Sequence, residues 1–191
     1  MSYKGDILYI EQVLAGKSYA FSHLVDHHKD RAYNLAFRIC GNHEEAEEIA
    51  QDSFLKAYRS LGGFKMKSSF ATWLYRIVYN TAISYVRIRK KGILSLEEFP
   101  VDAKDFIGNN ITEEEAEKEY RSSLISFALQ KISEEERGLI TLFYFEEMSI
   151  EEIADVTGIS KSNIKVRLFR ARQKMLEIIE KVEKKKFIYY E

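Results

Sequence analysis

Residues 149–175 read Ser-Ile-Glu-Glu-Ile-Ala-Asp-Val-Thr-Gly-Ile-Ser-Lys-Ser-Asn-Ile-Lys-Val-Arg-Leu-Phe-Arg-Ala-Arg-Gln-Lys-Met, and much of the architecture can be inferred from them. Ser149 and Glu152 have the spacing of a capping box, which predicts the start of a short helix. Gly158 marks a turn, and a long basic segment with helical periodicity begins at Lys161. This order predicts a helix-turn-helix. An ordinary helical hairpin with a solvated basic face is the alternative.

When the residues of the long helix are placed about 100° apart, apolar side chains lie on two opposite sides of it. Ile164 and Leu168 lie on the predicted core side, whereas Val166 and Phe169 lie on the opposite, polar side. Exposed apolar side chains need a reason, and in a major groove they could contact thymine methyl groups. DNA recognition is therefore favoured over the hairpin. The predicted duplex contacts are Asn163, Lys165, Val166, Arg167, Phe169, Arg170 and Lys174.

The composition of the whole chain predicts an all-α protein. Its 191 residues include one proline and nine glycines, which are few for the turns of an all-β fold. Cys40 is the only cysteine, so an internal disulfide or a multi-cysteine metal site is excluded. The longest apolar run is too short to span a bilayer, and no signal peptide is evident. We expect a cytoplasmic protein without membrane insertion.

The net charge of −1 hides a strong polarity along the chain. Residues 61–92 carry seven basic and no acidic side chains, and residues 161–191 carry ten basic and four acidic ones. Residues 93–160, between these blocks, carry five basic and 17 acidic side chains. Two basic blocks flanking an acidic one suggest two surfaces for a polyanion.

Upstream periodicity predicts four further helices, near Lys4–Leu14, Lys17–Cys40, Glu44–Leu61 and Ser69–Lys91. Short glycine turns join them into one bundle, residues 1–92. Residues 93–119 hold the only proline and nine acidic against two basic side chains, which predicts an acidic, poorly packed linker. Residues 120–191 form the second domain. Thr112 with Glu115, and Ser133 with Glu136, have the spacing of capping boxes for two of its helices. The predicted fold is therefore all-α, with two small helical domains joined by an acidic linker.

Residues 61–92, the acid-free block, suit the binding of single-stranded nucleic acid. Basic and amide side chains recur along the predicted helix Ser69–Lys91, away from an apolar stripe that runs from Phe70 to Ile88. A track for phosphates beside aromatic rings and an amide fits unpaired bases, although a plain charged helix face is the alternative. The candidate residues here are Phe64, Lys65, Lys67, Ser69, Arg76, Asn80 and Arg87.

Acidic side chains crowd the start of the predicted helix Glu44–Leu61. Part of this pattern complements the helix dipole. Glu48, Gln51 and Asp52 are expected on one exposed side of this helix, beside Phe54 and Leu55. A basic protein partner would fit this surface, and a solvated acidic face is the alternative.

These residues together resemble bacterial RNA polymerase sigma factors, specifically the extracytoplasmic-function (ECF) subgroup of the sigma-70 family. The resemblance rests on the segments Ala46–Phe54, Ser69–Ile77 and Ile164–Arg172, together with Asn80, and it covers nearly the whole chain. It implies a protein that binds core RNA polymerase and directs promoter recognition, DNA melting and transcription initiation. It implies neither an enzyme nor a cofactor.

The resemblance also implies a role for each surface. Residues 1–92 correspond to region 2, which binds the clamp of the largest polymerase subunit and melts and reads the minus-ten element. Residues 120–191 correspond to region 4, whose helix-turn-helix reads the minus-thirty-five element as duplex. Ser84 departs from a common aspartate, and the resemblance allows an anti-sigma factor as a further partner. The matching positions for polymerase contact are Glu45, Glu48, Gln51 and Asp52.

Two other interpretations compete with a sigma factor. A stand-alone helix-turn-helix repressor or activator would explain residues 120–184 but neither the acid-free block nor the acidic helix. A metal enzyme could use His23 and His27, which lie four residues apart beside three further candidate ligands, Asp26, His28 and Asp30. No HExxH motif accompanies them, and no Ser, Cys or His arrangement indicates nucleophilic catalysis. We therefore predict neither a catalytic nor a metal site.

Overall fold

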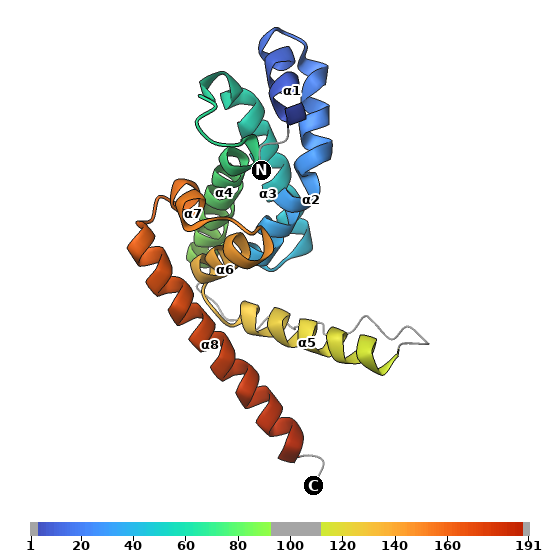
Figure 1. The fold of residues 1–191 in the computed structure, drawn as a ribbon, viewed down its shortest axis with the longest axis vertical. Helices are drawn as coiled ribbons and strands as arrows, with labels where there is room; N and C mark the ends of the chain where they lie inside the picture. The colour runs from blue at the N-terminus through green and yellow to red at the C-terminus, as the bar shows by residue number, and fades with distance from the viewer. Residues whose placement is uncertain (1–3, 93–111, 189–191) are drawn as a thin grey trace.

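The computed structural model describes residues 4–92 and 112–188, and the regular elements in these two ranges are all helices. The first range holds α1 (Lys4–Leu14), α2 (Phe21–Cys40), α3 (His43–Ser60) and α4 (Phe70–Gly92), with single 3-10 turns at Ser18–Ala20 and Leu61–Gly63. The second holds α5 (Glu113–Gln130), α6 (Glu134–Ile140), a π-helical turn at Thr141–Phe145, α7 (Ile150–Thr157) and α8 (Lys161–Ile188) (Figure 1). The predicted all-α fold is confirmed. None of the described helices has the length and apolar character needed to cross a membrane.

Local sequence signals explain most helix boundaries. Thr112, Ser133 and Ser149 each form a capping box with the glutamate three residues later, so α5, α6 and α7 begin where their sequences predict. Gly41 ends α2 with φ 79° and Gly158 ends α7 with φ 72°, a left-handed conformation that glycine adopts without steric cost.

The predicted linker, residues 93–119, lies mostly outside the described residues, which leave out 93–111. Residues 113–119 form the first turns of α5, so this helix begins before the predicted start of the second domain at residue 120. The capping box at Thr112 accounts for the early start. The domain boundaries themselves stay a prediction.

Helices from both described ranges share one hydrophobic core. α4 packs against α2 and α3 on one side and against α6 and α7 on the other (Figure 1). The prediction of a single buried stripe ending at Ile88 is therefore wrong at its end, since Ile88 is 70% exposed. Tyr75 and Tyr79 are buried instead, because α6 and α7 cover their face of α4.

The contact between α4 and α6 is very close at Gly138. A Cβ atom at this position would lie 2.6 Å from Cε2 of Tyr79 and 3.4 Å from Cδ1 of Ile39 on α2. Burial, with the nearby carboxylate of Glu135, raises the pKa of Tyr79 to about 12. Gly138 is thus required by close packing between the two halves of the chain.

Polar contacts surround this apolar seam. The hydroxyl of Tyr75 donates to Oε2 of Glu146 at 2.5 Å, and the guanidinium carbon of Arg38 lies 3.6 Å from the ring centroid of Phe145. Both contacts join the first described range to the second. The two halves therefore pack through a mixed apolar and polar interface.

Candidate nucleic-acid interface

The helix-turn-helix is present, and the core fixes the orientation of its second helix. Ile164, Leu168 and Ala171 of α8 are buried, and they share the core with Ile153 and Val156 of α7. Rotation of α8 about its axis is therefore fixed by side chains one and two turns apart. The helix presents a single, defined face to solvent.

That solvent face carries four of the seven predicted duplex contacts without an intramolecular ion pair. Val166 is 46% exposed and Phe169 is 54% exposed, and Lys165 and Arg170 lie exposed beside them. Neither cation forms an ion pair or a side-chain hydrogen bond with a described residue. The four side chains are available to a ligand.

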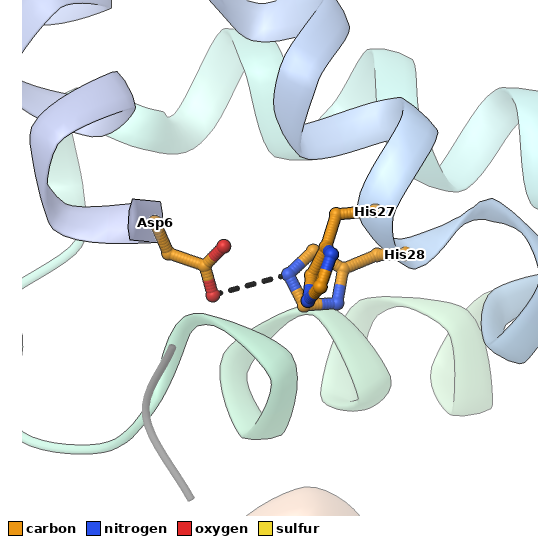
Figure 2. Close-up of side chains that lie close together, drawn as sticks. All are labelled: Asp6, His27 and His28. Carbon is orange, nitrogen blue, oxygen red and sulfur yellow. Dashed lines mark hydrogen bonds and ion pairs between the residues drawn. The ribbon is translucent and has the colours of Figure 1, made fainter. Parts of the chain in front are cut away.

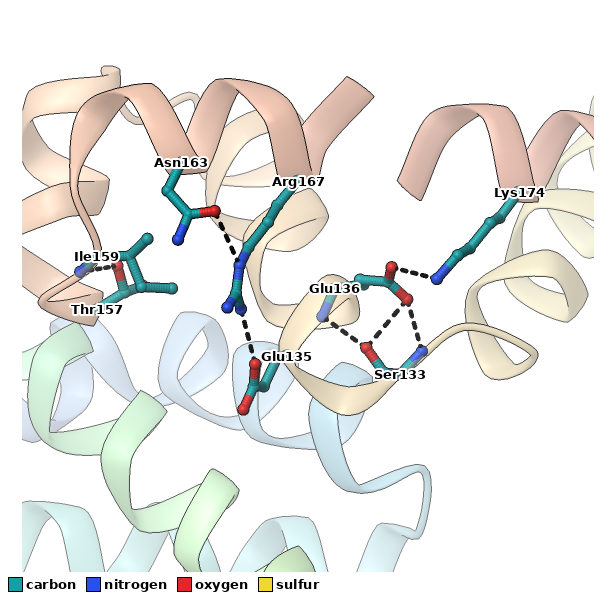
Figure 3. Close-up of polar contacts among 8 residues, drawn as sticks. All are labelled: Ser133, Glu135, Glu136, Thr157, Ile159, Asn163, Arg167 and Lys174. Carbon is teal, nitrogen blue, oxygen red and sulfur yellow. Dashed lines mark hydrogen bonds and ion pairs between the residues drawn. The ribbon is translucent and has the colours of Figure 1, made fainter. Parts of the chain in front are cut away.

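The other three predicted contacts are engaged with their own chain (Figure 3). Nη1 of Arg167 lies 2.7 Å from Oε2 of Glu135, and its Nε donates to Oδ1 of Asn163 at 3.3 Å. Nζ of Lys174 lies 2.5 Å from Oε1 of Glu136. Arg167 and Lys174 are thus held by α6 in the free protein.

Electrostatics at Glu136 reflect this pairing. Partial burial acts to raise the pKa of Glu136, but hydrogen bonds from Lys174 and from Ser133 outweigh it and lower the pKa. The Ser133 backbone amide and hydroxyl each donate to the same carboxylate at 3.0 Å (Figure 3). One glutamate therefore caps α6 and positions a cation of α8.

The predicted single-strand surface lies on the outer face of α4. Arg76, Asn80 and Arg87 are all exposed, and they fall within about 40° of one another around the helix axis. None of the three forms an ion pair or side-chain hydrogen bond with a described residue. α6 and α7 bury a different face of α4, which leaves this one open.

The loop before α4 divides into exposed cations and packed anchors. Lys65 and Lys67 are exposed, whereas the half-buried ring of Phe64 lies 5.0 Å from that of Trp73. Ser69 accepts a hydrogen bond from the backbone amide of Thr72 at 3.0 Å, which makes it a cap of α4. Phe64 and Ser69 thus shape the loop that displays the two lysines.

The acidic face of α3 is accessible, although its members differ. Glu48 and Gln51 are exposed, and Oε2 of Glu48 accepts a hydrogen bond from Tyr85 at 3.1 Å. Glu45 pairs with Arg89 at 2.6 Å and Asp52 pairs with Lys56 at 2.7 Å. Leu55, expected beside them, is 54% exposed, but the expectation for Phe54 is wrong, because this ring is 8% exposed and belongs to the core.

Sequence reasoning missed the acidic partners of these surfaces. Glu134, Glu135 and Glu136 begin α6 and pair respectively with Lys90, Arg167 and Lys174. The capping box at Ser133 predicts the role of Glu136 only. Three consecutive glutamates opening a seven-residue helix could have suggested partners on neighbouring helices.

The three histidines considered as metal ligands, His23, His27 and His28, all lie on α2. His23, Asp26 and His27 line a surface pocket with Asp6 and Tyr9, and His28 is buried behind it. Asp30 is exposed and does not line this pocket. The structure adds a candidate ligand that the sequence pattern did not indicate, Asp6. Its carboxylate lies within 4.8 Å of a ring nitrogen of His27 and of His28.

Two family models match the chain, Sigma-70 region 2 over residues 24–92 and Sigma-70, region 4 over residues 123–175. The chain is 34% identical over 176 residues to the ECF RNA polymerase sigma factor SigW of Bacillus subtilis, covering 86% of this chain and 91% of that protein. It is 33% identical over 171 residues to the RNA polymerase sigma-H factor of Pseudomonas aeruginosa, covering 86% and 88%.

Solved structures show the same fold. The structure of CnrH in complex with the cytosolic domain of CnrY matches with a TM-score of 0.65 at 22% identity, covering 93% of this chain and 98% of that one. The sigma factor RpoE in complex with the anti-sigma factor NepR from Bartonella quintana matches with a TM-score of 0.63 at 23% identity, covering 84% and 96%. The region 2 match excludes a stand-alone helix-turn-helix regulator. The chain belongs to the ECF sigma factors of the sigma-70 family, which bind core RNA polymerase and direct promoter recognition and transcription initiation.

Proposed function

We propose that this sigma factor divides its work among three surfaces. The outer face of α8 reads the minus-thirty-five element as duplex, the loop 64–69 and the outer face of α4 contact the minus-ten element, and the acidic face of α3 binds the clamp of the largest polymerase subunit. The observation that carries the proposal is the face of α8. Val166 and Phe169 are exposed there between two cations, while Ile164 on the opposite side is fully buried.

The assignment to α8 follows from what a major groove offers. Lys165 and Arg170 can reach guanine edges or phosphates, and Val166 and Phe169 can contact thymine methyl groups. Arg167 and Lys174, already oriented by α6, are placed to contact phosphates as backbone anchors. Base contacts at the centre and phosphate contacts at the edge are the usual division of such an interface.

The assignment to α4 follows from its charge. Residues 61–92 contain no acidic side chain, so a strand lying along this helix meets no repulsion from that segment. Arg76 and Arg87 supply charge for the backbone, and Asn80 between them supplies both a donor and an acceptor for an unpaired base. Melting is favoured when the open strand is bound more tightly than the duplex.

The assignment to α3 centres on two residues. Glu48 and Gln51 are exposed beside an apolar residue, Leu55, which gives a partner both hydrogen bonds and apolar area. Glu45 and Asp52 contribute charge while they hold Arg89 and Lys56. A basic partner surface would complement this face.

The test is a charge reversal with a matched control. Glu48→Lys with Asp52→Lys should abolish co-purification with core polymerase and leave binding to minus-thirty-five duplex unchanged. Glu11→Lys with Asp30→Lys makes the same change in charge on exposed positions of α1 and α2 and should retain polymerase. Wild-type recovery of polymerase by the α3 variant would contradict the assignment.

We propose further that the protein is not an enzyme and requires no cofactor for this role, since the polymerase performs RNA synthesis. Its site of action is then the cytoplasm, where bacterial polymerase works.

We also propose an anti-sigma partner. The CnrH and RpoE structures each contain a bound second protein. In the present chain a pocket between α2, α5 and α6 combines the apolar side chains of Phe37 and Leu129 with the guanidinium groups of Arg38 and Arg137. An acidic amphipathic helix has the matching chemistry, and its binding should slow amide hydrogen exchange around Phe37 and Leu129.

A further inference from the structure

A carboxylate and an imidazole are buried together where α1 packs on α2. Asp6 is 3% exposed and His28 is 4% exposed, and Oδ2 of Asp6 lies 3.1 Å from Nε2 of His28 (Figure 2). The rings of His27 and His28 are nearly perpendicular, with an interplanar angle of 89° and centroids 4.7 Å apart. Asp6, His27 and His28 each offer one ligand atom, and these atoms lie within 4.8 Å of one another.

The buried pair is incompletely satisfied by the described protein atoms. Nδ1 of His28 is buried and has no hydrogen-bond partner among them. Asp6 accepts its side-chain hydrogen bond from His28, and no arginine or lysine within the described ranges pairs with it.

A route from solvent leads to the cluster. The surface pocket beside it is lined by Asp6 and His27 together with Tyr9, His23 and Asp26. Asp26, which is largely exposed and lies 3.4 Å from Nζ of Lys29, places a second carboxylate at the solvent side of this pocket. A small cation can therefore approach Asp6 past groups that attract it.

We propose that Asp6, His27 and His28 bind one divalent cation of intermediate softness, of the kind represented by Zn²⁺, Co²⁺ and Ni²⁺. Two imidazole nitrogens and one carboxylate oxygen suit these ions, whereas Mg²⁺ and Ca²⁺ prefer oxygen ligands throughout. The cation replaces the hydrogen bond between Asp6 and His28 and balances the charge of Asp6.

The consequence of binding is a cross-link. Asp6 lies on α1 and both histidines lie on α2, so the cation ties the first helix to the second. α1 precedes the region 2 match, which begins at residue 24, and the proposed site is therefore a device that fastens an N-terminal element onto that domain.

Titration of the full-length chain with Co²⁺ tests the proposal, because coordinated Co²⁺ shows visible absorption whose intensity reports its geometry. His27→Gln removes an exposed ligand without emptying the core, and His43→Gln removes an exposed histidine of α3 as the matched control. We expect one Co²⁺ per chain that Zn²⁺ displaces, with affinity lowered about tenfold or more by His27→Gln and unchanged by His43→Gln. The absence of a thiolate charge-transfer band separates this site from Cys40.

Thermal unfolding provides the second measurement. Added Zn²⁺ should raise the Tm of the wild type and of His43→Gln and leave that of His27→Gln unchanged, since a ligand that binds only the folded state stabilises it. Asp6→Asn should behave as His27→Gln if its circular dichroism shows a folded chain. Equal affinity in wild type and His27→Gln, or no visible Co²⁺ band at millimolar metal, would overturn the proposal and leave Asp6–His28 as a hydrogen bond only.

Discussion

The exposed faces of α4 and α8 carry similar side chains but are held differently. On α4, Arg76 and Arg87 form no ion pair with a described residue. On α8, Arg167 and Lys174 are already bound to glutamates of α6. The first face can adapt its cations to a flexible strand, whereas the second presents two of its four predicted contact cations, Arg167 and Lys174, in fixed positions, which suits a duplex of regular geometry.

The start of α6 explains the difference. Glu135 and Glu136 both reach α8, and the preceding Glu134 reaches Lys90 at the far end of α4, at 2.8 Å. Each pair is partly exposed, so it stabilises the fold only modestly. Its larger effect is on geometry, because three successive residues of one helix orient cations on two others.

The largest effect is expected from the part of α8 that α6 does not hold. Arg170→Ala should weaken binding to minus-thirty-five duplex by about 1–3 kcal/mol and relax specificity at one base pair, as the loss of a base contact does. Arg31→Ala, an exposed arginine of α2, is the control. Fluorescence anisotropy with matched and mismatched duplexes measures both. A loss that is equal on every sequence would identify Arg170 as a phosphate contact instead.

An intermediate effect is expected from releasing a held cation. Glu135→Gln removes the partner of Arg167, which then behaves like the free arginines of α4. We expect tighter duplex binding at low salt, because the Arg167 guanidinium no longer divides its charge between Glu135 and a phosphate. The slope of log affinity against log salt should be steeper by up to about 0.9, the full value for one phosphate contact. A slope equal to that of the wild type would show that Arg167 already contacts phosphate fully despite Glu135.

The smallest effect is expected at the pair that links α6 to α4. Partial burial acts to raise the pKa of Glu134, but hydrogen bonds from Lys90 and from the backbone outweigh it and lower the pKa below the ordinary 4.5. The unfolded chain therefore binds this proton first, so the stabilisation is present above about pH 4.5 and is lost as the pH falls through the folded pKa.

Thermal unfolding between pH 6 and pH 3 should therefore show a smaller decrease in Tm for Glu134→Gln than for the wild type. Glu47→Gln, a substitution of an exposed glutamate of α3, should follow the wild type. Parallel curves for Glu134→Gln and wild type would mean that the pair with Lys90 does not contribute to stability.

Local features of the fold could be predicted from the sequence, and distant contacts could not. The capping boxes at Ser133 and Ser149 and the turn at Gly158 each depend on residues close in the chain, and all three are present. The burial of Tyr79 depends instead on Gly138, 59 residues later in the chain. The periodicity of α4 alone therefore predicted burial of Ile88, which is exposed, and did not predict burial of Tyr79. Periodicity identifies the apolar face of a helix. Which residues of that helix are buried also depends on the helices that pack against it, and local spacing does not reveal them.

The same limit applies to the candidate sites. The exposed face of α8 was predictable because helical geometry places Val166 and Phe169 opposite Ile164. The pair between Arg167 and Glu135 spans 32 residues, and that between Asp6 and His28 spans 22, and neither leaves a trace in local spacing. The roles assigned to individual site residues stay predictions.

The missing side chain at Gly138 has a mechanical consequence. Tyr79 lies so close to this glycine that a single added carbon atom would clash with its ring. Any motion that separates α4 from α6 exposes the ring of Tyr79 and the apolar side chains around it to water, which costs free energy. A partner that spreads the two helices must supply that free energy.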